Sequence, residues 1–370
     1  PVRPEVKLAI EECKTAGIRP IMITGDHKDT AVAIALELGI ITDASQAITG
    51  AELDEISDED FKTKVEGFSV YARVQPEHKT RIVNAWRAKG KVTAMTGDGV
   101  NDAPSIKNAD IGVGMGITGT DVTKNVADMI LTGDNFATIV SAVGEGRRIY
   151  DNIRKSIQFL LASNMSEVIS VFLVSIISGA TLFEAPHLLF INLITDCLPA
   201  IALGMEEGEK NVMKRAPRES NEGIFARGLG FGVVYQGIVV AALTMLSYYL
   251  GRYAFAGGSE ILGTSMAFLT LSLAEVFHSF NMRSLRGSIF TMKSQNKWLW
   301  GAGLLSLILT SVVVLVEPIA NVFSMTAIGW EEYLVAMALG FSIIPLVEVG
   351  KIFSRIMLAI QVNPPGKKNA

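Results

Sequence analysis

Met95-Thr-Gly-Asp-Gly-Val-Asn-Asp-Ala-Pro104 follows a short apolar segment, Lys91 to Ala94, and leads into a helical pattern. The segment has the composition of a β-strand, and the closing proline suits the first turn of a helix. In an open parallel sheet, ligands bind at the carboxyl ends of the strands, where Asp98, Asn101 and Asp102 suit Mg²⁺ and a phosphoryl group. Ordinary turns also use Asp, Asn and Gly. The whole run is far more specific than one such turn, and it predicts an α/β domain with a phosphate site.

A second strand with a polar tip comes earlier in the chain. The apolar segment Arg19 to Ile23 ends in Thr24, Gly25 and Asp26, and a helical pattern follows. This order places a hydroxyl and backbone N–H groups where a phosphate oxygen binds, and Thr24 is the predicted hydroxyl. The alternative is that Thr24 or Asp26 only caps the helix.

Lys79 lies in the first turn of a predicted helix that begins at Pro76 and runs through Lys89. A cation at this position is disfavoured by the helix dipole. The position is understandable if the lysine faces an anion such as a phosphoryl oxygen. A solvated surface lysine is the alternative, but the place of Lys79 between the two Gly-Asp segments favours the phosphate site.

Average composition conceals two different parts. The 370 residues are 49% hydrophobic and 19% charged, and the mean hydropathy is +0.36. The chain is typical of a soluble α/β domain up to about Tyr150, and long apolar runs of membrane-span length follow. The predicted spans are Ile157 to Ile177, His187 to Met205, Leu229 to Leu250, Leu262 to Phe280, Trp298 to Val316 and Tyr333 to Ile352. A helix from Phe136 is predicted to continue into the first of them.

The distribution of charge excludes one class of partner and predicts the orientation of the chain in the membrane. The net charge is −4 and no basic tract stands out, so a nucleic-acid partner is not supported. Lysines and arginines lie before the first span, between alternate pairs of spans and at the tail, whereas the other loops hold almost only Arg252. The positive-inside rule therefore predicts six spans with the soluble part and the carboxyl terminus in the cytoplasm. The basic residues are Arg147, Arg148, Arg154, Lys155, Lys210, Lys214, Arg215, Arg218, Arg227, Arg283, Arg286, Lys293, Lys297, Lys367 and Lys368.

Several polar side chains fall inside the predicted spans, where ionisable groups are costly and mark ion paths. They are Asn164 and Glu167 in the first span, Asn192, Thr195 and Asp196 in the second, and Glu275 in the fourth. All of them offer oxygen, which suits a hard cation, best Ca²⁺. Pro199 loosens the backbone near Asp196 and frees carbonyl oxygens. Interhelical hydrogen bonding is the alternative for any one of the polar residues.

With these residues in view, the chain resembles the carboxyl-terminal part of a P-type ATPase, most closely the reticulum-type calcium pumps and their bacterial relatives. The matching motifs are Thr24-Gly-Asp26, Ala72-Arg-Val-Gln-Pro-Glu-His-Lys79 and Met95-Thr-Gly-Asp-Gly-Val-Asn-Asp102. The resemblance implies an α/β part, a partial haloacid-dehalogenase-like Rossmannoid phosphorylation domain, followed by an all-α membrane part. The implied boundaries are 1–146 for the phosphorylation domain, 147–356 for six spans equivalent to the fifth to tenth of a pump, and 357–370 for a cytoplasmic tail.

The resemblance also implies roles for individual residues. Asp98 would bind Mg²⁺, Asn101 and Asp102 would complete that site, and the residues that hold the phosphoryl group and ATP would be Thr24, Gly25, Asp26, Arg73 and Lys79. The Ca²⁺ ligands would be Asn164, Glu167, Asn192, Thr195, Asp196 and Glu275. Sodium/potassium pumps resemble the chain but carry an acid in place of Asn192, so the amide favours calcium. The acid at Glu167 allows for two ions.

The expected function is Ca²⁺ export driven by ATP through an aspartyl phosphate, in the plasma membrane of a bacterium. The phosphorylated aspartate, the actuator and nucleotide-binding domains and the first four spans are expected outside this chain, which begins like an internal segment and is expected to be inactive alone. The first strand of the phosphorylation domain is expected to be missing with them, which leaves a sheet edge unpaired. The alternatives are a pump for Na⁺, Mn²⁺ or H⁺, a membrane-anchored phosphatase of the haloacid-dehalogenase type, and a non-catalytic part of a split pump.

Overall fold

The computed structural model describes residues 2–362 except 210, 220, 221, 227, 256, 257 and 286. Of the basic residues used to predict orientation, Lys210, Arg227, Arg286, Lys367 and Lys368 lie outside the described residues, as do residues 363–370 of the predicted tail. The chain divides into two compact units. The first comprises residues 1–148 and 208–222, and the second comprises residues 149–207 and 223–370.

The first unit is an α/β domain built from short elements. Its strands are β1 (Met22–Ile23), β2 (Ala47–Thr49), β3 (Val70–Ala72), β4 (Ala94–Gly97), β5 (Ile111–Met115) and β6 (Met129–Leu131). Its helices are α1 (Pro4–Thr15), α2 (Lys28–Glu37), α3 (Gly50–Asp54), α4 (Asp58–Lys64), α5 (Pro76–Ala88), α6 (Ala103–Asn108) and α7 (Asp121–Val126). The 3₁₀ turns are η1 (Ala44–Gln46), η2 (Val65–Gly67), η3 (Val100–Asp102) and η5 (Val212–Lys214). The α/β prediction is confirmed.

The strands form two parallel sheets in the order β1-β3-β2 and β4-β5-β6. The register pairs Met22 with Val70 in the first sheet and Thr96 with Val113 in the second. Each sheet therefore ends at a strand, β1 or β4, that has only one strand partner and that leads into one of the predicted phosphate loops. An edge strand presents unpaired backbone groups, so both loops are attached to sheet edges that can accept a further strand.

The structure differs from the sequence-based prediction in two segments. The strand before the Gly-Asp-Gly turn was expected at Lys91 to Ala94, but β4 begins at Ala94 and includes Met95, the buried residue of the strand. Val92 is 63% exposed, so the apolar composition did not mark the paired residues. No strand or helix was predicted for residues 42–64, yet β2, α3 and α4 lie there. These elements are too short to show a clear hydrophobic period.

The helix α8 (Phe136–Ser178) is continuous over 43 residues. It begins in the first unit and continues into the second. Its first turn is capped by Asn135, whose Oδ1 accepts from the backbone N–H of Ala137 at 2.9 Å. The prediction of one helix that leads from the α/β domain into the first span is confirmed.

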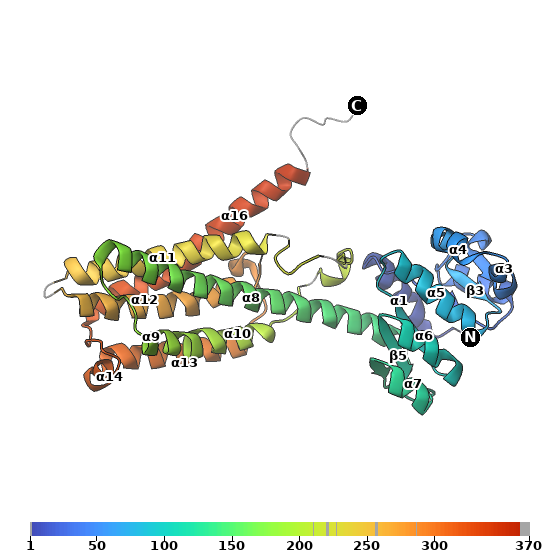
Figure 1. The fold of residues 1–370 in the computed structure, drawn as a ribbon, viewed down its shortest axis with the longest axis horizontal. Helices are drawn as coiled ribbons and strands as arrows, with labels where there is room; N and C mark the ends of the chain where they lie inside the picture. Colours follow the sequence, from blue (N-terminus) through green and yellow to red (C-terminus); the bar gives the residue numbers. More distant parts are fainter. Residues whose placement is uncertain are drawn as a thin grey trace. The chain divides into compact units, whose positions relative to one another are not determined.

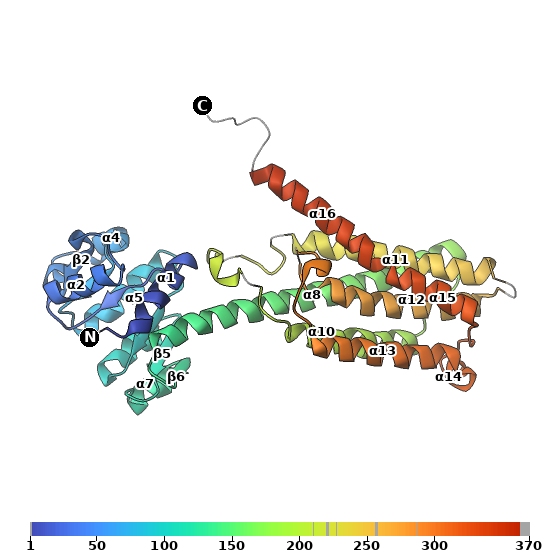
Figure 2. The ribbon, with the colours of Figure 1, turned by 180° about the vertical axis from the view of Figure 1, so that it is seen from behind.

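The second unit is a helical bundle. Besides α8 it contains α9 (Ala185–Phe190), the π-helical segment η4 (Ile191–Asp196), α10 (Cys197–Gly204), α11 (Leu229–Tyr253), α12 (Glu260–Asn281), α13 (Lys297–Leu315), α14 (Glu317–Val322), α15 (Trp330–Phe341), α16 (Ile343–Val362) and the 3₁₀ turn η6 (Ile289–Thr291). Figures 1 and 2 show the long helices running side by side. Within the described residues, six candidate spans have the length and apolar composition to cross a membrane, as predicted.

The helix α12 forms the centre of this bundle. In the apolar 18-residue stretch of α12, 83% of the residues are buried, whereas the corresponding share is 33–39% in the other five candidate spans. Its fully buried residues Met266, Phe268 and Leu269 belong to the largest hydrophobic cluster of the molecule. A polar residue on α12 is therefore shielded by protein on almost every side, and Glu275 is such a residue, with no exposed surface.

Candidate cation site and phosphate site

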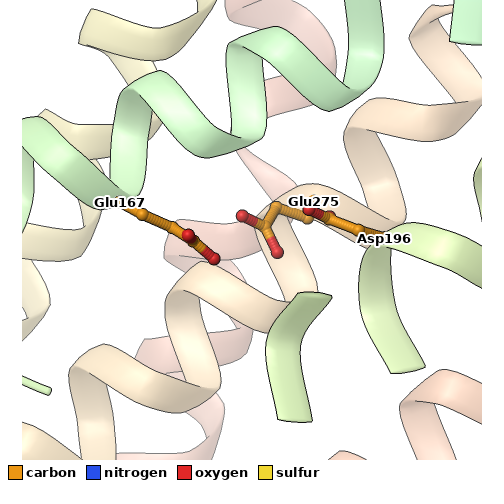
Figure 3. Close-up of side chains that lie close together, drawn as sticks. All are labelled: Glu167, Asp196 and Glu275. Carbon is orange, nitrogen blue, oxygen red and sulfur yellow. The ribbon is translucent and has the colours of Figure 1, made fainter. Parts of the chain in front are cut away.

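Three carboxylates meet inside the helical bundle. Glu167 comes from α8, Asp196 from the end of η4 and Glu275 from α12, and Figure 3 shows their side chains directed toward one another. One oxygen of each lies within 4.8 Å of one oxygen of each of the other two. All three side chains are buried. The structure thus brings together the three acids that the sequence predicted from separate spans.

The backbone of the second span is distorted at this cluster. The segment η4 is π-helical, whereas α9 before it and α10 after it are α-helical. Pro199 has no N–H, so the helical bond to the carbonyl of Thr195 cannot form. A π-helical segment inside an α-helix commonly marks a functional site. The sequence predicted a loosened backbone here but not the π form.

Neutral polar groups contact two of the carboxylates. The Nδ2 of Asn192 donates to both oxygens of Glu167, at 3.1 and 3.2 Å. The hydroxyl of Thr195 donates to Oε2 of Glu275 at 3.0 Å. Both oxygens of Asp196 and the Oε1 of Glu275 are buried and accept no hydrogen bond in the described structure.

Such an arrangement requires positive charge. Buried carboxylates without a paired cation are strongly destabilising, and orphaned oxygens on two of the three groups converge on one point. Carboxylate, amide and hydroxyl oxygens are the ligands that hard divalent cations prefer. The donor set therefore fits a cation bound between the three helices.

Asn164 behaves differently from its predicted partners. It lies three residues before Glu167, and this spacing predicted a shared helix face. In the structure Asn164 is exposed and its amide donates to the carbonyl of Leu160 at 2.7 Å. Its side chain makes no hydrogen bond to the three carboxylates in the described part of the chain. The structure thus brings five of the six predicted ligands together.

The loop after β4 is organised around Asp102. The carboxylate of this buried residue pairs with the ammonium of Lys79 and accepts from the backbone N–H groups of Asp98 and Gly99, at 3.3 and 3.2 Å. Lys79 therefore contacts an anion at the helix start, as its position indicated, and that anion is Asp102. Asp98 and Asn101 remain exposed at the end of the strand.

The contacts of Asp102 limit the part that it can take in a magnesium site. Because both oxygens of Asp102 are already engaged, direct ligation by protein falls on Asp98. An exposed carboxylate at a strand end fits Mg²⁺, which commonly binds one or two carboxylates and keeps several waters.

The Thr24 loop forms a separate group on the β1-β3 sheet. The backbone N–H of Asp26 donates to Thr24 Oγ1 at 3.1 Å, and the N–H of Arg73 donates to the Asp26 carbonyl at 3.1 Å. Arg73 adopts a left-handed backbone with φ +49°, which is uncommon for a residue other than glycine. No hydrogen bond joins this group to Asp98 or Asp102 in the described structure. The two predicted halves of the phosphate site thus sit on two sheet edges.

A cavity of about 350 Å³ beside Arg73 was not predicted. Its lining includes Asp54 and His78, whose Oδ1 and Nε2 lie 2.8 Å apart. His78 belongs to the Pro-Glu-His-Lys segment before Lys79. The sequence marked this histidine only as part of a motif, because its partner Asp54 lies in an acidic stretch with no evident pattern.

Two family models match separate parts of the chain. Residues 180–353 match the family described as "Cation transporting ATPase, C-terminus". Residues 1–110 match the family described as "haloacid dehalogenase-like hydrolase". The same combination was expected from the sequence motifs. The chain belongs to the cation-transporting P-type ATPases.

Curated relatives agree with this family. The chain is 46% identical to calcium-transporting ATPase 1 of Bacillus cereus over 362 residues, which is 94% of this chain and 40% of the relative. It is 47% identical to a calcium-transporting ATPase of Listeria monocytogenes, over 95% of this chain and 40% of the relative. Identity is 35% to the endoplasmic reticulum-type calcium-transporting ATPase 4 of Arabidopsis thaliana, over 98% of this chain and 40% of that protein. The chain thus spans about 40% of the length of each of these relatives.

Proposed function

We propose that this chain is the carboxyl-terminal part of an ATP-driven Ca²⁺ pump and that Glu167, Asp196 and Glu275 bind the transported ion. The observation that carries the proposal is the convergence of three buried carboxylates from three helices, two of which have oxygens without a hydrogen-bond partner in the described structure. A buried acid cluster among apolar helices has no stabilising role without a cation. The other predicted cations and a phosphatase are favoured by no contact in the described residues.

The donor chemistry supports calcium as the cargo. Asn192 and Thr195 supply amide and hydroxyl oxygens beside the carboxylates, which is the mixture that Ca²⁺ binds with six to eight ligands. The relatives named above carry calcium in their names. Asn164, which is exposed in this chain, would join the ligands together with oxygens supplied by the fourth span of the parent pump.

The first unit would provide half of the phosphorylation site. Asp98 would hold Mg²⁺, which neutralises the charge of the transferring phosphoryl group when bound. Thr24, Gly25, Asp26, Arg73 and Lys79 would position phosphate oxygens of ATP and of the phosphoenzyme, with Asn101 and Asp102 completing the loop. The ammonium of Lys79 would either move from Asp102 to the phosphoryl group or contact both groups.

The remaining parts would come from the rest of the parent protein. The edges of β1 and β4 are suited to receive one parallel strand between them, and we propose that this strand carries the phosphorylated aspartate. The actuator and nucleotide-binding domains and the first four spans would complete the pump. We place it in a bacterial plasma membrane, with the first unit and the carboxyl terminus in the cytoplasm.

Transport by the full-length protein tests the proposal. Inverted membrane vesicles from cells that express it should accumulate ⁴⁵Ca²⁺ on addition of MgATP, and a calcium ionophore should release the label. Vesicles from cells without the protein are the control. ATP-driven uptake of Na⁺ or Mn²⁺ without uptake of Ca²⁺ would contradict the proposed cargo.

Thr195→Ala should weaken calcium binding without abolishing it. The substitution removes the hydroxyl that donates to Glu275, and a hydrogen bond to a charged group contributes about 1.5 kcal/mol or more. We expect the Ca²⁺ concentration for half-maximal phosphorylation to rise about tenfold, with the maximal level retained. Thr244→Ala is the matched control, since Thr244 is equally buried and its hydroxyl donates to Val240 of its own helix. Equal effects of the two substitutions would remove Thr195 from the site.

A further inference from the structure

A second polar cluster, separate from the three carboxylates, lies buried in the bundle. Glu206, just after α10, pairs with Arg283, just after α12, and the two side chains are 1% and 7% exposed. The Nε of Arg283 lies 3.1 Å from both oxygens of Glu206, and a terminal nitrogen lies 2.8 Å from Oε1. This is the forked geometry in which arginine binds a carboxylate most strongly.

Two asparagines extend this pair to other helices. Asn296, the cap of α13, donates from Nδ2 to Oε2 of Glu206 at 2.9 Å and to the carbonyl of Ala202 at 2.8 Å. Asn152 of α8 donates from Nδ2 to the backbone carbonyl of Glu206 at 2.7 Å. We call Asn152, Glu206, Arg283 and Asn296 the polar clamp.

The polar clamp joins the same three spans that carry the carboxylates. Asn152 precedes Glu167 on α8, Glu206 follows the span of Asp196, and Arg283 follows the span of Glu275. Since α8 enters the bundle where α10 and α12 end, the clamp holds one end of all three. Each acid is thus attached to the clamp through no more than a few helical turns.

Burial makes this cluster sensitive to the loss of one member. A satisfied buried ion pair contributes little net stability, but removal of one partner leaves an uncompensated buried charge. The buried charge that remains then draws in water or shifts its helix end. A shift of either α10 or α12 changes the separation of Asp196 and Glu275, on which a cation bound by both depends.

We infer that Glu206 and Arg283 are positioning residues for cation binding: their ion pair fixes the spacing of the ends of α10 and α12 and so of Asp196 and Glu275. The inference rests on the proposed function for the identity of the cation. It does not need either residue to contact the ion. The sequence showed Arg283 only as one of the basic residues that indicate orientation, and Glu206 carried no signal.

Single and double substitutions in the full-length protein test the inference. Glu206→Gln and Arg283→Gln should each raise the Ca²⁺ concentration for half-maximal phosphorylation from ATP by about tenfold or more. The double variant should show a smaller increase than either single variant, because neither charge of the Glu206–Arg283 pair is left without the other. Arg283→Lys should fall between wild type and Arg283→Gln, since lysine keeps the charge but not the fork. Phosphorylation from inorganic phosphate without Ca²⁺ should stay within twofold of wild type in all variants.

The matched control is the pair between Arg252 and Glu260 at the other end of α12. Its atoms lie 2.7 Å apart, but the Glu260 side chain is 58% exposed, so Arg252→Gln should leave the calcium dependence within twofold of wild type. The inference is overturned if the single clamp variants keep wild-type calcium dependence, if their effects multiply in the double variant, or if phosphorylation from inorganic phosphate is lost in parallel. If the wild type responds to another cation instead, the proposed function fails, and the same titration with that cation still decides the role of the clamp.

Discussion

Asp196→Asn in the full-length protein is expected to abolish Ca²⁺-activated phosphorylation from ATP. The substitution keeps the size of the side chain but removes a negative charge whose two oxygens are buried and accept no hydrogen bond in the described structure. At an effective dielectric constant of about 20, unit charges about 4 Å apart interact by about 4 kcal/mol, and each charge of a divalent ion contributes. We therefore expect calcium affinity to fall by about a thousandfold or more.

The loss should be specific to the cation site. Phosphorylation of Asp196→Asn from inorganic phosphate without Ca²⁺ should persist, because the α/β unit is unchanged. Glu317→Gln is the control, since it removes a carboxylate that is exposed at the start of α14. Normal calcium affinity in Asp196→Asn, measured by ⁴⁵Ca²⁺ binding, would rule out the proposed site.

The second large effect is expected in the phosphorylation reaction, from the substitution Asp98→Ala. Asp98 is the exposed carboxylate at the end of β4, and Asp102 is already bound by Lys79 and backbone N–H groups. Loss of a group that stabilises charge in the transition state costs on the order of a hundredfold or more in rate. Mg²⁺-dependent phosphorylation should fall at least that much, while ⁴⁵Ca²⁺ binding stays at the wild-type level.

A matched exposed residue separates this effect from a general change of charge. Asp60 lies in α4 of the same unit and is also exposed, so Asp60→Ala should phosphorylate normally. Loss of calcium binding together with phosphorylation in Asp98→Ala would indicate misfolding rather than a lost metal ligand. Retained phosphorylation at the wild-type rate would contradict the role assigned to Asp98.

The features that the sequence predicted well are those encoded in contiguous residues. Apolar runs of membrane length predicted the six candidate spans, and acids inside such runs identified Glu167, Asp196 and Glu275, since burial of charge in lipid is too costly to be incidental. The long α8 was visible because its helical pattern continues without a break. The two Gly-Asp segments, each after an apolar strand, predicted the α/β domain for the same reason.

The features that it missed depend on partners distant in the chain. The short strand β2 and the helices α3 and α4 are stabilised by packing around Leu53 and Tyr71 and carry little local signal. The exposure of Asn164 depends on which part of α8 faces its neighbours, and spacing alone indicated a shared face with Glu167. The pairing of Glu206 with Arg283 joins residues from different loops and has no sequence pattern. Interactions of this kind can be identified only from the three-dimensional structure.

We propose that Ca²⁺ bound at Glu167, Asp196 and Glu275 triggers phosphoryl transfer at the site that Asp98 helps to form. The most direct measurement is phosphorylation of the purified full-length protein from radiolabelled ATP in the presence of Mg²⁺, titrated separately with Ca²⁺, Na⁺ and Mn²⁺. We expect an acid-stable phosphoenzyme at micromolar Ca²⁺ and none with Na⁺ alone. A phosphoenzyme that forms with Na⁺ but not with micromolar Ca²⁺ would contradict it.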